Sequence, residues 1–151
     1  MSSAHVELSV EVSAPQSEVF EYFTAWSRQN EWMLGTQVHV TNPQLDPKGL
    51  VVGSEIAAFT GIGFLGFWDP MRVTVFEAPF RVDVVHLGRV VRGTGTMLVE
   101  STSETTSRFV WSEDLDLPLG ALGLFGFTIL KPLFLFGVHQ SLKKFARQFE
   151  K

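Results

Sequence analysis

Apolar and polar residues alternate in the first segment of the chain. Apolar side chains stand at every second position from Val6 to Val12, with polar side chains such as Glu7 and Glu11 between them. A period of two predicts a β-strand with one buried and one solvated face. Ser13-Ala14-Pro15 ends the strand, and a proline suits the first turn of a following helix.

The spacing then changes to that of a helix. Val19, Phe20, Phe23 and Trp26 recur at helical intervals, which predicts one short amphipathic helix. A second short helix is predicted over residues 27–33, ending near Gly35.

Strand-like segments return after residue 35. They are predicted over residues 36–40, 54–60, 71–77, 81–87, 93–100 and 107–115. Turn signals separate them, among them Asn42-Pro43, Asp46-Pro47-Lys48-Gly49 and Ala78-Pro79. Short strands joined by tight turns favour a meander of antiparallel hairpins.

The last third of the chain becomes helical again. Val138, Leu142, Phe145 and Phe149 are spaced 4, 3 and 4 residues apart, which is one stripe of an amphipathic helix. These elements predict an α+β fold. A curved antiparallel sheet of about seven strands would wrap around the long C-terminal helix, with two short helices after the first strand.

One long apolar run precedes that helical stripe. Leu117–Val138 contains a single charge, Lys131. Its length would suit a membrane span, but the central Lys131 and Pro132 disfavour one. We expect the run to line or cap an internal cavity, and contact with a membrane surface or a partner is the alternative.

Composition narrows the class of protein. The 151 residues, of which 45% are hydrophobic and 19% charged, predict one globular domain over residues 1–151. The absence of Cys excludes disulfides and thiolate-held metals, and scattered histidines predict no metal site and no cofactor. A net charge of −4 argues against nucleic-acid binding. The N-terminus lacks a basic segment followed by an apolar one, so we expect a cytoplasmic protein without stable membrane insertion.

Several segments together carry a family resemblance. They are Val10-Glu11-Val12-Ser13-Ala14-Pro15, then Trp32, then Glu77-Ala78-Pro79-Phe80-Arg81 and Phe109-Val110-Trp111-Ser112-Glu113. With the order of elements, they resemble the START-like helix-grip (SRPBCC) superfamily, and within it the polyketide cyclase/dehydrase-like branch. The resemblance implies an internal cavity. It leaves activity open, because this superfamily includes lipid carriers, hormone receptors and cyclases.

Strand alternation selects two candidate polar groups. Phe109, Trp111 and Glu113 share one face of their strand, and the two aromatic rings favour the inside for that face. His86 shares a face with Val82 and Val84. A buried carboxylate beside a histidine could move a proton, so Glu113 and His86 are the candidate catalytic pair. A core or rim position with no catalytic role is the alternative for both.

Gly61-Ile62-Gly63-Phe64-Leu65-Gly66 matches a dinucleotide-binding pattern by chance. The pattern should open a helix after the first strand of a βαβ unit, whereas another strand follows here. We expect a hairpin tip that carries Phe64, Phe67 and Trp68 as a lid over the cavity, or simply a tight turn with packed rings.

The predicted function is binding of a small hydrophobic or polycyclic molecule. The expected wall of its site comprises Trp32, Phe59, Phe64, Trp68, His86, Phe109, Trp111, Glu113, Phe125, Ile129 and Leu133. One alternative is a cyclase- or dehydratase-like enzyme using Glu113 and His86. Another is interaction with a membrane or lipid surface through residues 117–138. The sequence leaves a homodimer open.

Overall fold

The predicted α+β architecture is confirmed. A computed structural model describes residues 2–62, 65–89, 91–117 and 119–150. The strands are β1 Ser2–Val12, β2 Thr36–Val40, β3 Glu55–Ile62, β4 Leu65–Glu77, β5 Arg81–His86, β6 Gly93–Ser101 and β7 Ser107–Leu117. The helices are α1 Gln16–Phe23, the 3₁₀ helix η1 Trp26–Glu31 and the long α2 Ala121–Arg147.

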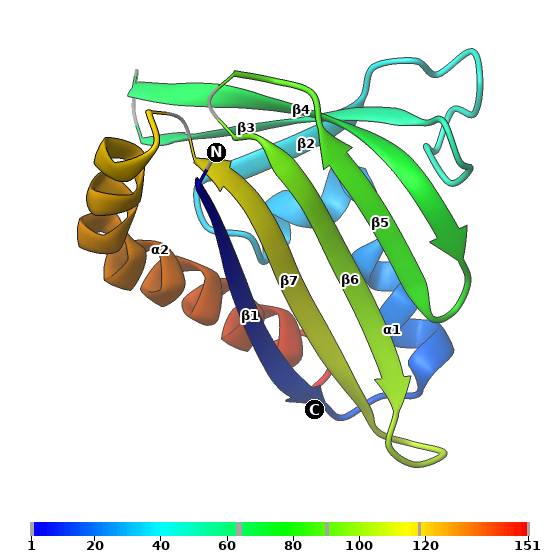
Figure 1. Ribbon diagram of the computed structural model, residues 1–151. Helices are drawn as coiled ribbons and strands as arrows, with labels where there is room; N and C mark the ends of the chain where they lie inside the picture. Colours follow the sequence, from blue (N-terminus) through cyan, green and yellow to red (C-terminus); the bar gives the residue numbers. More distant parts are fainter. Residues whose placement is uncertain (1, 63–64, 90, 118, 151) are drawn as a thin grey trace.

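All seven strands form one antiparallel sheet. Their order is β1-β7-β6-β5-β4-β3-β2, so only the pairing of β1 with β7 departs from a simple meander. Figure 1 shows the sheet curving, with α1 and η1 on its concave side. The two short helices follow β1 as the sequence predicts.

The predicted long C-terminal helix is confirmed, and it includes most of the apolar run. α2 runs from Ala121 to Arg147 with Pro132 inside it, so the apolar run and the amphipathic stripe are one element. Its last turns pack on the sheet and bury Leu142 and Phe145, whereas its first half extends beyond the edge of the sheet (Figure 1). Within the described residues, α2 is the only helix that is long and apolar enough to span a membrane.

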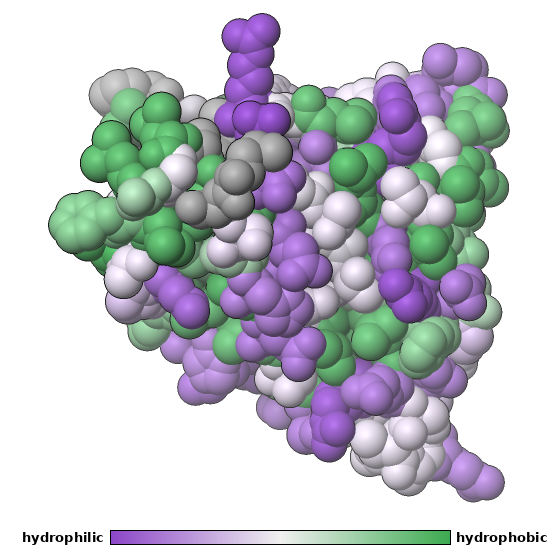
Figure 2. Space-filling view, in the orientation of Figure 1, coloured by the Kyte–Doolittle hydropathy of each residue, from purple (hydrophilic) through white to green (hydrophobic). Residues whose placement is uncertain are grey.

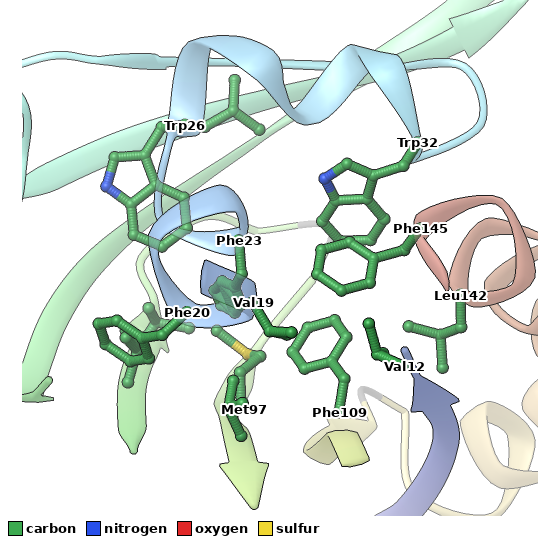
Figure 3. Close-up of a cluster of buried hydrophobic side chains, with 14 of the residues drawn as sticks. Val12, Val19, Phe20, Phe23, Trp26, Trp32, Met97, Phe109, Leu142 and Phe145 are labelled. Atoms are coloured by element: carbon green, nitrogen blue, oxygen red, sulfur yellow. The ribbon is translucent and has the colours of Figure 1, made fainter. Parts of the chain in front are cut away.

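Aromatic rings form the centre of the core. Phe109 of β7 and Phe145 of α2 are fully buried, with ring centroids 4.7 Å apart. Trp32 packs edge-on against both of them, and Phe23 of α1 packs edge-on against Phe109. Figure 3 shows these rings converging from α1, β7, α2 and the residue that follows η1. This contact fixes the C-terminal half of α2 to the sheet.

Strand β4 begins earlier than predicted. The sequence suggested a hairpin tip up to Pro70, but the strand already pairs with β3 from Leu65 onward. Gly61 and Gly66 face each other in this pairing. A Cβ at Gly61 would collide with the carbonyl oxygen of Leu65, so the glycines permit close strand contact.

We predict that Phe145→Ala lowers the free energy of unfolding by about 3–5 kcal/mol, because it removes the ring at the centre of the core. Urea denaturation measures the change. Phe136→Ala in the same helix is the matched control: Phe136 is 61% exposed, and its loss should cost no more than about 0.5 kcal/mol. Equal losses in the two variants would contradict the packing described.

Candidate ligand cavity

A cavity of about 570 Å³ lies between the sheet, η1 and the first half of α2. Most of its wall is apolar. The lining residues are Phe23, Trp26, Gln29, Trp32, Met33, Leu34, Thr36, Val38, Ile56, Ala58, Thr60, Phe67, Asp69, Met71, Val84, His86, Val91, Arg92, Met97, Trp111, Glu113, Leu115, Asp116, Leu117, Phe127, Leu130, Leu133, Phe134, Gly137, Val138 and Ser141. The cavity exists because α2 covers only part of the concave face.

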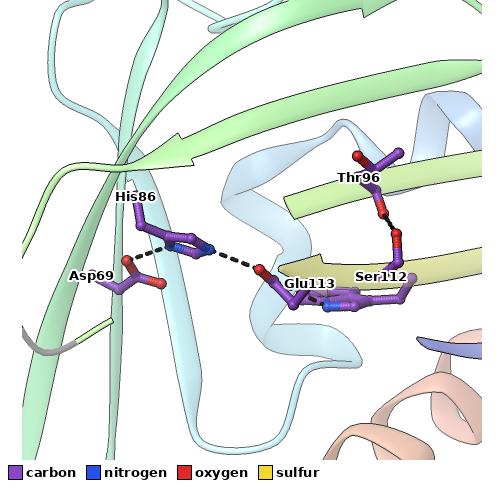
Figure 4. Close-up of polar contacts among 6 residues, drawn as sticks. Asp69, His86, Thr96, Ser112 and Glu113 are labelled. Carbon is purple, nitrogen blue, oxygen red and sulfur yellow. Dashed lines mark hydrogen bonds and ion pairs between the residues drawn. The ribbon is translucent and has the colours of Figure 1, made fainter. Parts of the chain in front are cut away.

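Three ionisable side chains meet in the wall of the cavity. The imidazole of His86 lies between two carboxylates: its Nδ1 is 2.9 Å from Asp69 Oδ1, and its Nε2 is 2.8 Å from Glu113 Oε2. The side chains of His86 and Glu113 are 3% and 7% exposed. Figure 4 shows the line from Asp69 through His86 to Glu113. The cluster is therefore a buried polar site in an apolar cavity.

Glycines allow this cluster to form. His86 is on β5 and Glu113 on β7, with β6 between them. In the strand register, Gly93 is opposite His86 and Gly95 is opposite Glu113. A Cβ at Gly95 would lie only 3.0 Å from Glu113 Oε2. Because β6 carries no side chains here, the carboxylate reaches over it to the imidazole.

The other oxygen of Glu113 has its own partner. The indole N–H of Trp111 donates to Glu113 Oε1 over 3.2 Å. Trp111 and Trp32 meet edge-on, with ring centroids 6.3 Å apart. One aromatic wall therefore runs from the core to the polar cluster, and it holds the orientation of the carboxylate.

The two carboxylates set the charge of His86. Burial by itself lowers the pKa of His86, but the hydrogen bonds to Asp69 and Glu113 and their charges outweigh it, and they raise the pKa from 6.5 to about 9. The raised pKa favours, at neutral pH, an imidazolium that donates from both nitrogens. This explains why each nitrogen faces a carboxylate oxygen.

Glu113 is destabilised as an anion by the same surroundings. Burial raises its pKa above the usual value, and the hydrogen bond and charge of His86 offset part of that rise. The proton between Nε2 and Oε2 thus has two possible holders at a separation of 2.8 Å. Such a pair can orient a polar group of a ligand or transfer a proton to it.

Five of the residues predicted for the site line this cavity. They are Trp32, His86, Trp111, Glu113 and Leu133. The predicted alternation on β7 is confirmed, because Phe109 and Glu113 are buried while Arg108 and Asp114 are exposed. Glu113 and His86 are in contact, as the proposed pair requires.

The other predicted wall residues lie elsewhere. Phe59 and Trp68 pair with each other across β3 and β4 on the outer face, with centroids 5.1 Å apart. The prediction that Trp68 faces the cavity is wrong by one position, because Phe67, its neighbour on the strand, is the ring that lines the cavity. Phe64 lies outside the described residues.

Two further corrections concern the core and α2. Phe109 is buried among Phe145, Phe23 and Trp32 and does not reach the cavity. Phe125 and Ile129 are on the outer side of α2, 65% and 62% exposed. Sequence spacing identified the helix but not which of its apolar sides faces inward.

Asp69 is the site residue that the sequence analysis missed. It stands between Phe67 and Met71 in an alternating series, next to the predicted hairpin tip and before the predicted strand over residues 71–77. That alternation was the available signal, because Met71 is opposite His86 in the sheet and places Asp69 on the same face. Among the described residues, no group of histidine and carboxylate side chains is arranged to hold a metal ion.

This fold and this cavity define a class of protein: helix-grip domains with an internal cavity between a curved sheet and a long helix. Residues 3–150 match the family model described as polyketide cyclase / dehydrase and lipid transport, and the chain belongs to that family. The curated proteins contain no match.

Several solved structures share the fold of this chain. The Zhui aromatase/cyclase from Streptomyces sp. R1128 has a TM-score of 0.79 at 13% identity, covering 99% of this chain and 94% of that one. A START superfamily protein from Mycobacterium smegmatis gives 0.73 at 11% identity, covering 95% and 97%. The di-domain aromatase/cyclase BexL gives 0.73 at 15% identity, with 95% of this chain covering 45% of that one. At these identities the likeness establishes the fold alone.

We predict that NMR titration gives His86 a pKa near 9 and that Glu113→Gln lowers it, because the variant removes one anionic acceptor. Gly95→Ala should lower it as well, since the added Cβ displaces the Glu113 carboxylate. A His86 pKa that does not change in either variant would contradict the hydrogen-bonded cluster.

We also predict that the free energy of unfolding depends on pH through His86 and Glu113. The folded-state pKa of His86 lies above its unfolded value, so its contribution is complete below about pH 6.5 and is lost as the pH rises towards 9. The raised pKa of Glu113 acts in the same direction. Urea denaturation should therefore show a falling free energy of unfolding across that interval.

Proposed function

We propose that this protein binds a small hydrophobic molecule, of polycyclic size, with a polar group directed at the His86–Glu113 pair. The observation that carries the proposal is a largely apolar cavity whose wall contains one buried charged cluster. Its volume of about 570 Å³ lies within the range of ligand pockets, roughly 300–1,000 Å³.

The polar cluster supports a ligand that is not purely a hydrocarbon. A carboxylate and an imidazolium are costly to bury, even as a pair. His86 uses both of its nitrogens within the cluster, but the carboxylate oxygens of Glu113 keep further lone pairs, which suit a ligand hydroxyl group that donates to them. Aromatic side chains such as Trp111 and Phe134 suit a flat apolar body. The family and the aromatase/cyclase neighbours are consistent with such a ligand.

A proton-transfer enzyme is the second candidate, and the arrangement Asp69–His86–Glu113 favours it. Ionised Glu113 could remove a proton from the carbon next to a carbonyl group, becoming the acid while the substrate becomes an enolate. Solvent or His86 would return a proton to the substrate. Asp69 would act as a positioning residue that keeps His86 oriented and charged.

We predict that native mass spectrometry of the freshly purified protein detects a co-purified apolar molecule. In parallel, N-phenyl-1-naphthylamine, a neutral fluorescent probe, should bind at one site. Trp111→Ala should weaken that binding by at least about tenfold, because it removes a large apolar contact from the cavity wall.

Trp68→Ala is the matched control, since Trp68 is 54% exposed and lies on the outer face of the sheet. Binding by this variant should equal that of the wild type. An equal loss in both tryptophan variants, or no saturable binding by the wild type, would refute binding in this cavity.

For the enzymatic candidate we predict deuterium uptake at the acidic carbon of 2-tetralone, a bicyclic ketone, in D₂O. Wild-type protein should exceed the buffer rate by about 100-fold or more, and Glu113→Gln should abolish the excess. Asp69→Asn should shift the pH profile of the remaining rate. If the wild-type rate equals that of buffer while the fluorescent probe still binds, this ketone chemistry is wrong and the binding function stands.

A further inference from the structure

The outward side of α2 is apolar over half the length of the helix. Five large side chains form one stripe along it, spaced 3, 4, 4 and 3 residues apart, and they are between 61% and 71% exposed. They are Leu122, Phe125, Ile129, Leu133 and Phe136. In Figure 2 hydrophobic residues gather over this part of the molecule, at the upper left. An exposed apolar patch of this extent marks an interaction surface.

Four of the five stripe residues do not line the cavity, and the fifth, Leu133, lies at its edge. Phe127, Phe134 and Val138 line the cavity on the other side of the helix. The first half of α2 is therefore apolar on both sides, and only the inner side faces this chain's own cavity. Burying the outer side requires a surface that the described residues do not supply.

The same stripe continues as a basic one. After Phe136, the outward positions are occupied by Gln140, Lys143, Lys144 and Arg147, three of them cationic and exposed. α2 contains no Asp or Glu, although the whole chain has a net charge of −4. An apolar stripe followed by cations matches an anionic lipid surface, which has an apolar interior and negatively charged headgroups.

The cavity opens in the same surface. Leu130, Leu133, Phe134 and Phe67 line the cavity and are also exposed, which places them at its mouth. Three of the four are on the first half of α2. A surface that covers the outer stripe therefore lies next to the opening.

We propose that the first half of α2 docks this domain on an anionic lipid bilayer, with the apolar stripe in the interface and Lys143, Lys144 and Arg147 at the headgroups. A second copy of the chain explains the charges less well. Two-fold pairing of α2 would cover the apolar stripes but would supply no acidic partner from α2 for the cations.

Docking would also give the ligand a direct route into the cavity, an inference that rests on the proposed function. An apolar ligand could pass between the bilayer and the cavity mouth without crossing water, where its exposure is unfavourable. The source of the ligand would then be the lipid phase.

The first test needs no variant. Wild-type protein should float with vesicles of equal parts phosphatidylcholine and phosphatidylglycerol, and bind vesicles of phosphatidylcholine alone at least about tenfold more weakly. Raising the salt from about 0.1 M to about 1 M should reduce binding to the anionic vesicles, because charges are then screened within ~3 Å. No flotation with the anionic vesicles would overturn the proposal.

The second test uses Phe125→Gln with Ile129→Gln, neither of which lines the cavity. This variant should lose at least about tenfold in vesicle affinity, while its binding of N-phenyl-1-naphthylamine in solution stays unchanged. The control is Leu45→Gln with Val52→Gln, which replaces apolar side chains that are 53% and 59% exposed on another part of the surface. Equal vesicle binding by the two double variants would overturn the assignment.

Sedimentation in solution tests the alternative that the stripe pairs two copies of this chain. A wild-type dimer that Phe125→Gln with Ile129→Gln converts to a monomer, without vesicle binding by either, would assign the stripe to a second copy and overturn docking on lipid. The two assays also distinguish failure of the docking proposal from failure of the proposed function. Vesicle binding without probe binding refutes the ligand cavity alone, and probe binding without vesicle binding refutes the docking surface alone.

Discussion

The packing of Phe145 and Leu142 of α2 on the sheet is the contact on which the site depends. It fixes only the C-terminal half of the helix, because the rings of Phe109 and Trp32 occupy the core at that end. Beyond this contact α2 diverges from the concave face, and no other helix among the described residues fills the space. The cavity is therefore a product of incomplete coverage: the sheet has more apolar surface than one anchored half-helix can bury.

The charged cluster is stable in this space because its members satisfy one another. An imidazolium or a carboxylate buried alone would change its protonation or destabilise the fold. His86 avoids that outcome with a carboxylate at each nitrogen, and Trp111 donates to the remaining oxygen of Glu113. The site also requires a glycine at position 95, because the missing side chain lets His86 and Glu113, which are two strands apart, come within 2.8 Å of each other. Interaction between the groups, rather than burial alone, decides the charge of His86.

The sequence predicted the fold well because its hydrophobic periods are regular. Alternation on β7 and β5 placed Glu113 and His86 on inner faces, and the spacing of Leu142 and Phe145 identified the buried stripe of the helix. It failed where a segment is apolar on more than one side. Around Trp68, adjacent aromatic residues conceal the alternation, and along the first half of α2 nearly every position is apolar, so period alone cannot choose the inward side. Asp69 was missed because the neighbouring Trp68 conceals the same alternation, and its contact with His86 also depends on the strand register.

The two halves of α2 differ in which of their sides are apolar, and this difference connects the cavity with the exposed stripe. A helix whose only role is to close a core needs one apolar side, and α2 satisfies that requirement in its last turns, where basic residues occupy the outer side. In its first half, apolar side chains also occupy the outer side, which costs solubility and does not stabilise the isolated domain. The change occurs between Phe136 and Gln140, beyond the part of the helix that borders the mouth of the cavity. The exposed apolar surface therefore coincides with the entrance. A function that brings apolar molecules to this entrance explains both the uncovered stripe and the cavity, whereas a role in folding explains neither.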